Sequence, residues 1–326
     1  MISTTRRTLA ALAALCLTLG VAACGDDNKS SSGSTSTPAA ADGKTIQRDA
    51  ANASKPTVTV GSKNFTEQFI LGEVYAQTLE AQGFKVKRRL NLGSEQVAYK
   101  ALKGGSIDMY PEYTGTALTS FFNVKTQDVP KDPDEAYNEA KQKYAAQNIT
   151  ALARTPFQNT YIIASTKATA DKAGNPKTVS ELFSKNPKLS ISGFPECRQR
   201  QDCLLGLRSV FGFKGKFVSS DGKFNDLDQG QSDLTLAFST DPQLALTDKY
   251  TAYQDDKQFF PPYNITLGIR NSTVQEIGQK AVDTLEAVQK GMTEEAMREL
   301  NRRVELDKQQ PKKVAAEYLK EEGFVS

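Results

Sequence analysis

The sequence predicts an α/β protein with mainly parallel, mixed sheets covered by helices. β-rich and helix-like segments alternate along most of the chain, and few tight hairpin signals separate them. Strands are expected at residues 57–61, 84–90, 107–110, 161–165, 188–193, 234–239 and 265–270. Helices are expected at residues 67–82, 94–104, 132–147, 178–183, 204–211, 274–289, 294–300 and 312–322. From residue 57 onward the chain is long enough for one large domain or for two lobes.

Two of these helices have clear local signals. The first places Phe69, Val74 and Leu79 near one face, and Gly83 ends it. The helix that starts near residue 132 opens with Asp-Pro-Asp-Glu at 132–135, which supplies an N-cap, a proline at the first helical position and a capping-box acid. Ligand sites in such folds form where strands end, so the polar and aromatic residues after each strand are the ones to inspect.

The first 23 residues have the pattern of a secretory signal peptide. A basic start is followed by an apolar run at 9–21, which is too short to span a bilayer, and by small residues. The residues up to Cys24 resemble the bacterial lipobox, in which the cysteine becomes the lipidated first residue; the alternative is an ordinary signal cut that leaves a free thiol. Residues 24–56 are rich in Ser, Thr, Gly and Ala and are expected to form a disordered tether. We therefore expect an exported protein, lipid-anchored to the outer face of the cell membrane or the periplasmic side of a membrane.

Composition excludes several classes of function. The net charge of +3 gives no concentrated basic face, so nucleic acid is not an expected partner. The chain contains no histidine, which removes a Ser-His-Asp triad and the usual imidazole metal sites, and we expect no metal and no cofactor. Cys197 and Cys203 remain outside the signal and the lipid site. In an oxidising compartment a disulfide is the simplest reading, and a two-cysteine zinc site is the rival.

Five short motifs follow one another along the chain. They are VGSKNFTEQ at 60–68, NLGS at 91–94, PEYTGT at 111–116, ECRQRQDC at 196–203 and PPY at 261–263. This ordered set resembles the substrate-binding proteins of osmoprotectant ABC importers, which take up glycine betaine, choline, carnitine and related solutes. The resemblance covers essentially all of residues 57–326.

The resemblance implies a two-lobed periplasmic-binding-protein fold of type II that closes on its ligand like a clamp. Lobe 1 would comprise residues 57–157 and 262–326, and lobe 2 would comprise residues 158–261. The two crossovers between the lobes would act as a hinge. It further implies a monomeric, non-catalytic protein that gives a small zwitterionic or cationic solute to ABC permease and ATPase subunits at the membrane.

A quaternary ammonium group has no N–H, so hydrogen bonds cannot hold it. Ring faces can, at about 0.5 to 2 kcal/mol per ring, so several rings are needed. Carried over from the family pattern, the aromatic box consists of Tyr113, Tyr161, Phe238 and Tyr263. Relatives commonly have Tyr where this chain has Phe238, a change that keeps the ring face but removes a hydroxyl and so affects ligand selectivity.

The resemblance also assigns polar residues to the site. A zwitterionic solute carries a carboxylate, which Lys63 and Arg200 would meet. Thr116 would donate a hydrogen bond, and Gln68 and Asn159 are further candidates for lining the cleft. A Cys197–Cys203 bond would close a short loop around Arg200, worth about 2 kcal/mol, and would hold Arg200 in place for the carboxylate.

Three other interpretations stay open. The carboxylates of Glu67, Asp108 and Glu112 could form the acid pair of an exported hydrolase, although nothing fixes their spacing. The same fold could bind choline or an amino acid, but Lys63 and Arg200 would then lack an anion to meet, which favours a betaine-type zwitterion. The chain could also be a sensor or adhesion lipoprotein that works without a transporter.

Overall fold

The computed structural model describes residues 45–326. The predicted signal peptide at 1–23 and the lipidation site Cys24 lie outside the described residues. None of the helices within the described part combines the length and apolar character that a membrane crossing requires.

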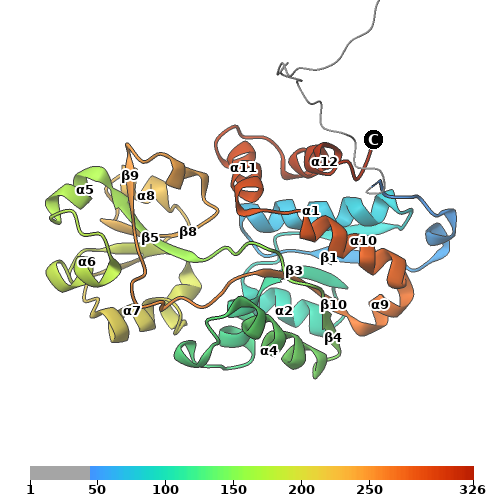
Figure 1. Cartoon of the computed structure of the whole chain (residues 1–326), viewed down its shortest axis with the longest axis horizontal. Coiled ribbons are helices and arrows are strands. Elements are labelled where there is room, and N and C mark those ends of the chain that lie inside the picture. Colours follow the sequence, from blue (N-terminus) through green and yellow to red (C-terminus); the bar gives the residue numbers. More distant parts are fainter. Residues whose placement is uncertain (1–44) are drawn as a thin grey trace, which may run out of the picture. The chain divides into compact units, whose positions relative to one another are not determined.

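The first of two five-stranded sheets is built from both ends of the chain. Its strands, in spatial order, are β2 (Val86–Arg89), β1 (Val58–Gly61), β3 (Met109–Tyr113), β10 (Ile265–Arg270) and β4 (Ile149–Ala151). β1 runs parallel to β2 and β3, whereas β10 is antiparallel to both β3 and β4. We call the part of the chain built on this sheet lobe 1 (Figure 1).

The second sheet lies in the middle of the chain and repeats this pairing pattern. Its order is β7 (Phe217–Ser219), β6 (Ile191–Gly193), β8 (Leu234–Phe238), β5 (Tyr161–Thr166) and β9 (Tyr250–Tyr253). β6 is parallel to β7 and β8, and β5 is antiparallel to β8 and β9. We call this part lobe 2. Half of the strand pairs are therefore antiparallel, whereas mainly parallel sheets were expected. The antiparallel strands are β5 and β10. The chain reaches each of them through a crossover from the other lobe, and not through a helix that covers the same sheet.

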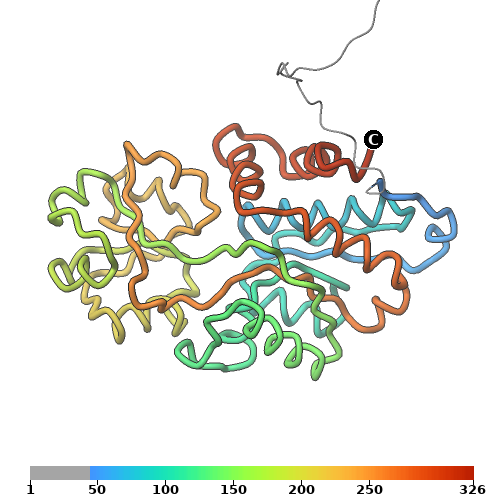
Figure 2. The backbone as a smooth tube through the Cα atoms, in the orientation of Figure 1, coloured from blue at the N-terminus to red at the C-terminus, as the bar shows by residue number. Residues whose placement is uncertain are grey.

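Two segments connect the lobes. The chain leaves lobe 1 after β4, enters lobe 2 at β5, and returns from β9 to β10 (Figure 2). The segments run side by side, because Gln158 and Asn264 form an antiparallel bridge and the amide of Asn159 donates to the carbonyl of Tyr263 at 3.0 Å. Residues on either side of these crossovers are therefore brought close to both sheets.

Helices cover the sheets of each lobe. In lobe 1 they are α1 (Thr66–Ala81), α2 (Glu95–Lys103), α3 (Thr114–Thr116), α4 (Pro133–Ala145), α9 (Asn271–Ile277), α10 (Gln279–Lys290), α11 (Glu294–Glu305) and α12 (Pro311–Glu321). In lobe 2 they are α5 (Lys167–Lys172), α6 (Val179–Lys185), α7 (Leu204–Phe211) and α8 (Phe224–Asp228). The most enclosed is α1, which packs on the first sheet and against α10, α11 and α12 (Figure 1). Its residues Leu71, Tyr75 and Leu79 are fully buried. The helix is therefore buried on more than one side, whereas the sequence predicted a single apolar face.

The end of the predicted tether packs on lobe 1 instead of remaining free. Ala50–Ser54 form a 3₁₀ turn, η1, and the amide of Ile46 donates to the carbonyl of Phe324 at 2.8 Å. The buried side chain of Asn52 donates to the carbonyl of Gln82 at 2.9 Å. The expected boundary at residue 56 is thus too late, because polar side chains can order a segment without an apolar pattern.

Two further differences from the expected elements have local causes. The single helix expected at 274–289 is divided into α9 and α10 at Gly278, whose φ of +81° interrupts helical geometry. Strands β4, β7 and β9 were not expected. Each lies at a sheet edge and has only three or four residues, too few to show an alternating pattern.

Candidate binding site

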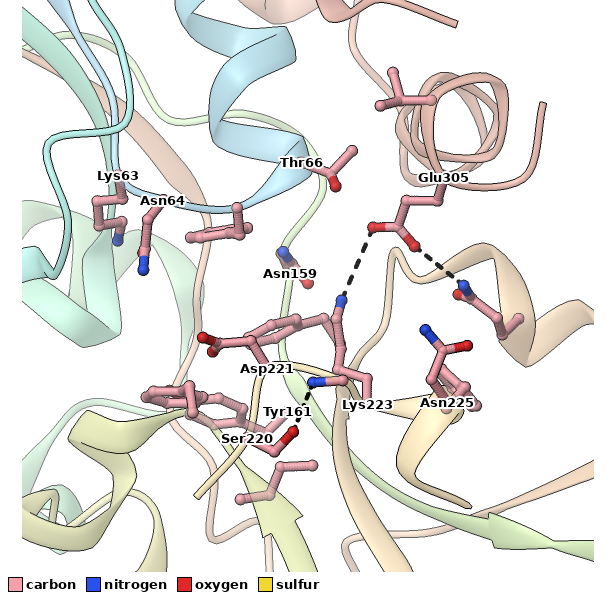
Figure 3. Close-up of a pocket in the computed structure, with 18 of the residues that line it drawn as sticks. Lys63, Asn64, Thr66, Asn159, Tyr161, Ser220, Asp221, Lys223, Asn225 and Glu305 are labelled. Carbon is pink, nitrogen blue, oxygen red and sulfur yellow. Dashed lines mark hydrogen bonds and ion pairs between the residues drawn. The ribbon is translucent and has the colours of Figure 1, made fainter. Parts of the chain in front are cut away.

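A cavity of about 630 Å³ lies between the two lobes and contains most of the residues assigned to the site. Its lining includes Lys63, Tyr113, Thr116, Asn159, Tyr161, Arg200, Phe238 and Tyr263. Most of these residues lie at or next to an end of a strand, as expected for an α/β fold, whereas Thr116 ends α3 and Arg200 lies in the loop before α7. Figure 3 shows polar side chains from both lobes around the cavity, among them Lys63 and Asn159.

The four predicted rings are brought together, and two more join them. Tyr161 lies 5.4 Å from Phe238 and 5.1 Å from Tyr263, measured between ring centroids. Phe65 stacks between Tyr113 and Phe238, at 6.1 Å and 5.8 Å, and thereby connects a lobe 1 ring to a lobe 2 ring. We call these five rings, with Phe194, the aromatic cage.

Phe65 and Phe194 are the cage members that the sequence interpretation missed. Phe194 stacks on Tyr161 at 5.9 Å. Both residues come shortly after a strand, Phe65 beyond β1 and Phe194 directly after β6. The rule that ligand-contacting residues follow strand ends could have found both, since Phe65 also belongs to the first of the five motifs.

Cations of the chain itself approach the cage faces. The Nζ of Lys63 is 4.4 Å from the centroid of Tyr113, and the Nζ of Lys223 is 5.0 Å from that of Phe238. The guanidinium carbon of Arg200 lies 5.9 Å from the Tyr161 ring. These distances are within the range of attractive cation–π contacts, so three of the cage rings already lie against positive charge of the chain itself.

Lys63 is paired with a buried carboxylate of lobe 1. Its Nζ forms an ion pair with Glu112, which is fully buried and also accepts the hydroxyl of Tyr110 at 3.0 Å. Burial raises the pKa of Glu112 despite the opposing effect of Lys63. Gln68 stands behind this pair and does not reach the cavity: its side chain accepts the Lys63 amide and donates to the carbonyl of Pro111, each at 3.0 Å. Gln68 therefore supports the wall, contrary to its predicted place in the lining.

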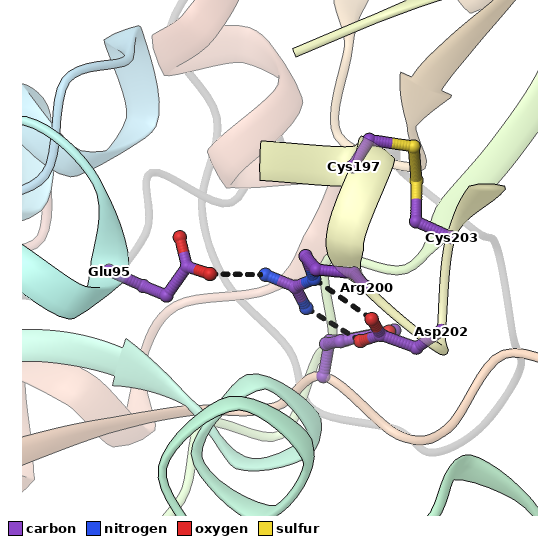
Figure 4. The surroundings of a disulfide bond; sticks show 6 residues. Glu95, Cys197, Arg200, Asp202 and Cys203 are labelled. Carbon is purple, nitrogen blue, oxygen red and sulfur yellow. Dashed lines mark hydrogen bonds and ion pairs between the residues drawn. A yellow bond between two sulfur atoms is a disulfide. The ribbon is translucent and has the colours of Figure 1, made fainter. Parts of the chain in front are cut away.

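Arg200 is paired as well. Its Nε and Nη2 donate to Asp202 at 2.8 Å and 2.5 Å, and its Nη1 donates across to Glu95 of lobe 1 at 3.3 Å (Figure 4). Burial alone would raise the pKa of Asp202, but Arg200 outweighs it and the pKa lies below its usual value. Thr116 of lobe 1 accepts a weak contact from Nη2 at 3.4 Å. Lys63 and Arg200 are thus both paired with carboxylates of the chain, and their contact with a ligand carboxylate stays a prediction.

The loop that carries Arg200 is closed by a disulfide between Cys197 and Cys203 (Figure 4). Both sulfur-bearing residues are fully buried in the core of lobe 2. Arg200 and Asp202 lie inside the loop, so the bond limits the positions that this pair can adopt. The disulfide therefore closes the loop that carries this charge pair, and Arg200 of the pair also contacts Glu95 of lobe 1.

A third cation, Lys223, was not expected at the site. It pairs with Asp241 at 2.5 Å. It also reaches toward Glu305 of lobe 1 at 4.0 Å (Figure 3). Its backbone φ of +47° is unusual for a residue with a side chain. Gln243 also donates to Glu305, at 3.1 Å. No sequence pattern signalled this contact, because its partners lie in different lobes.

The Glu67 side chain connects more segments of the chain than any of the ion pairs described above. This carboxylate, in the first turn of α1, accepts hydrogen bonds from Tyr113, Asn159, Thr240 and Asn301 at 2.8, 2.9, 2.6 and 3.3 Å. Burial raises its pKa, and the four hydrogen bonds oppose that effect only in part.

The third carboxylate considered for a hydrolase, Asp108, also has partners within the chain, as Glu67 and Glu112 do. It accepts a hydrogen bond from the Thr59 amide at 2.7 Å and pairs with Arg270 at 3.4 Å.

Comparison with known proteins identifies the family. Residues 56–321 match the family described as the substrate binding domain of ABC-type glycine betaine transport system. The chain belongs to this family. It is a family of substrate-binding domains and not a family of enzymes.

Several relatives and solved structures of this substrate-binding family are similar over most of the chain. A glycine-betaine-binding protein of Pseudomonas aeruginosa is 30% identical over 284 residues, which cover 82% of this chain and 89% of the relative. The ergothioneine transport permease/ergothioneine binding protein EgtU of Helicobacter pylori is 29% identical over 276 residues, or 83% of this chain, and this match spans only 48% of that protein. A crystal structure described as a glycine betaine/carnitine/choline ABC transporter aligns with a TM-score of 0.65 and 26% identity, covering 81% of this chain and 98% of that one.

Removing the disulfide should loosen the Arg200 pair. In a Cys197→Ser, Cys203→Ser variant we expect the free energy of unfolding to fall by about 2 kcal/mol, because the loop regains freedom in the unfolded chain. Ligand affinity should also fall, since Arg200 borders the cavity. Denaturant unfolding and calorimetric titration measure the two effects. A folded double variant with unchanged affinity would show that the loop does not position Arg200.

The buried Glu67 makes stability depend on pH in a defined direction. Its folded-state pKa is raised, so the folded protein binds a proton more readily than the unfolded chain. Compared with a Glu67→Gln variant, which does not titrate there, the wild-type free energy of unfolding should decline as pH rises through that pKa. Parallel denaturation curves between about pH 4 and 8 measure the difference, starting from the ordinary glutamate pKa of about 4.3. A difference that stays constant over this range would contradict the raised pKa.

Proposed function

We propose that this protein captures a solute with a quaternary ammonium group in the aromatic cage and gives it to an ABC permease. The observation that carries the proposal is the set of ring faces from both lobes around one cavity. Such faces are what a cation without N–H groups requires. The names of the Pseudomonas relative and of the similar crystal structure, which mention glycine betaine, carnitine and choline, support the same ligand class.

We further propose a location at the membrane and a movement of the two lobes. Lipidation at Cys24 would keep the binding domain close to the permease. A monomer would suffice, because residues of a single chain line the cavity. The two crossovers, paired at Gln158 and Asn264, would serve as the hinge through which the lobes separate and release the solute.

The identity of the second group on the solute is a separate question. The three cations that lie against the cage rings already have carboxylate partners: Glu112 for Lys63, Asp202 and Glu95 for Arg200, and Asp241 for Lys223. A ligand carboxylate would have to compete with these acids. The Oδ1 of Asn159, by contrast, has no hydrogen-bond partner among the described residues; Asn159 lines the cavity, and this oxygen itself is covered by protein atoms. An unpaired acceptor favours a ligand with a hydroxyl group.

We therefore propose a choline-type alcohol as a second candidate beside the betaine-type zwitterion that the sequence favoured. Choline supplies both the trimethylammonium group for the rings and a hydroxyl donor for Asn159.

Truncating one cage ring should weaken binding. Tyr263 packs edge-on against Tyr161, and its hydroxyl donates to Asp202 at 2.6 Å. In Tyr263→Ala we expect affinity for quaternary ammonium solutes to fall by at least about tenfold, since a ring contact is worth up to about 2 kcal/mol and the Asp202 contact is lost too. Calorimetric titration with glycine betaine, choline, carnitine, proline betaine and proline measures this. Tyr137→Ala is the matched control, because Tyr137 lies on α4 with its hydroxyl at 3.4 Å from the Ala151 carbonyl.

No heat with any of these solutes, in a folded wild-type protein, would overturn the proposed function.

The same titration ranks the two ligand types. We expect choline to bind about tenfold more tightly than glycine betaine, because a hydroxyl-to-amide hydrogen bond adds about 1 kcal/mol and no acid has to be displaced. Tetramethylammonium is the matched probe, since it has the cation without a second group. A preference for glycine betaine would mean that Lys63 or Arg200 exchanges its carboxylate for that of the ligand.

A further inference from the structure

The Glu67 carboxylate holds residues of both lobes at once. Its side chain is almost completely buried, and it is not among the described residues that line the cavity. Two of its hydrogen-bond partners belong to different lobes. Tyr113 is the last residue of β3 in lobe 1, and Thr240 follows β8 in lobe 2. The hydroxyls of both donate to the same carboxylate, at 2.8 Å and 2.6 Å, one on each oxygen.

The other two partners reinforce this junction. Asn159 lies in the first crossover and donates to the oxygen that Tyr113 contacts. Asn301, on α11 of lobe 1, donates to the oxygen that Thr240 contacts and also to the Thr240 carbonyl at 3.1 Å. Each carboxylate oxygen therefore has two donors, and lobe 2 supplies one of the four through Thr240. A buried carboxylate that lost this donor would be left partly unsatisfied, which is costly away from water.

We infer that Glu67 is a positioning residue that links ligand capture to the approach of the two lobes. It orients the Tyr113 ring of the cage and, through Thr240, holds lobe 2 against the same point. The inference rests on the proposed function, because it assigns a role in the binding of the same solute. It adds that residues outside the cavity lining set the affinity.

The contact between Glu67 and Thr240 depends on how far the two lobes are apart. Movement about the crossovers would take Thr240 away from α1, whereas Tyr113 and Glu67 both belong to lobe 1 and stay together. The Glu67–Thr240 hydrogen bond is then made only when the lobes meet. This hydrogen bond therefore stabilises the closed form but not the open form. An interaction made in only one of two forms shifts the equilibrium toward that form, so its free energy adds to the binding of any solute that contacts both lobes.

Substitution of Thr240 isolates this contact without changing the cavity lining. Thr240→Val keeps the side-chain shape and removes the donor. Thr240→Ser keeps the hydroxyl and serves as the conservative rescue. Thr235→Val is the matched control: Thr235 is an equally buried threonine of lobe 2, and its hydroxyl accepts from Ser192 of the same lobe at 3.0 Å.

Two measurements on the purified protein decide the inference. The first is calorimetric titration with choline and glycine betaine. We expect Thr240→Val to lower the affinity about tenfold, as for the loss of a hydrogen bond to a charged group, while Thr240→Ser and Thr235→Val stay near wild type. The second is small-angle X-ray scattering without solute, in which Thr240→Val alone should show a larger radius of gyration.

The outcomes separate this inference from the proposed function. If wild type binds and Thr240→Val binds equally well, the inference is overturned and the proposed function stands. Equal losses in Thr240→Val and Thr235→Val would also overturn it, because they would show a general packing effect. If wild type binds neither solute, the proposed function fails, and the scattering comparison then supports or overturns the link between the lobes by itself.

Discussion

Buried charge is the constraint that shapes the interior of this protein between its two sheets. An ionised group without a partner in a dry interior costs several kcal/mol, so each must find an opposite charge or several donors. Lys63 and Arg200 meet this requirement with carboxylates, and Glu67 meets it with four neutral donors. These partners come from distant parts of the chain and from both lobes. The contacts that compensate the buried charges therefore also hold the two lobes against each other.

The aromatic cage depends on the same arrangement. Phe65 and Tyr113 belong to lobe 1, whereas Tyr161, Phe194 and Phe238 belong to lobe 2. The rings stack across the boundary, as between Phe65 and Phe238 at 5.8 Å, and the chain's own cations lie against their faces. A site of this kind is complete only where both lobes contribute, which suits a protein that must hold a solute and later release it.

The sequence predicted the elements that have strong periodic or capping signals and missed those fixed by long-range contacts. The helix at α4 begins at Pro133 after the Asp132 cap, as its motif indicated. The short edge strands and the break at Gly278 lack such signals. At the site, family motifs found the rings of Tyr113 and Tyr263, but no local pattern shows that Lys63 faces Glu112. Charge pairing between separate segments depends on the folded arrangement, so the pairs of Lys63 with Glu112 and of Arg200 with Glu95 could not be predicted from sequence alone.

The central claim is that a trimethylammonium group lies within the cage and touches rings from both lobes. A crystal structure of the protein with choline or glycine betaine bound tests it most directly. The account predicts the quaternary nitrogen within about 6 Å of the ring centroids of Tyr113 in lobe 1 and Phe238 in lobe 2. A bound solute whose nitrogen contacts the rings of one lobe only, or lies among the acidic side chains away from the cage, would contradict it.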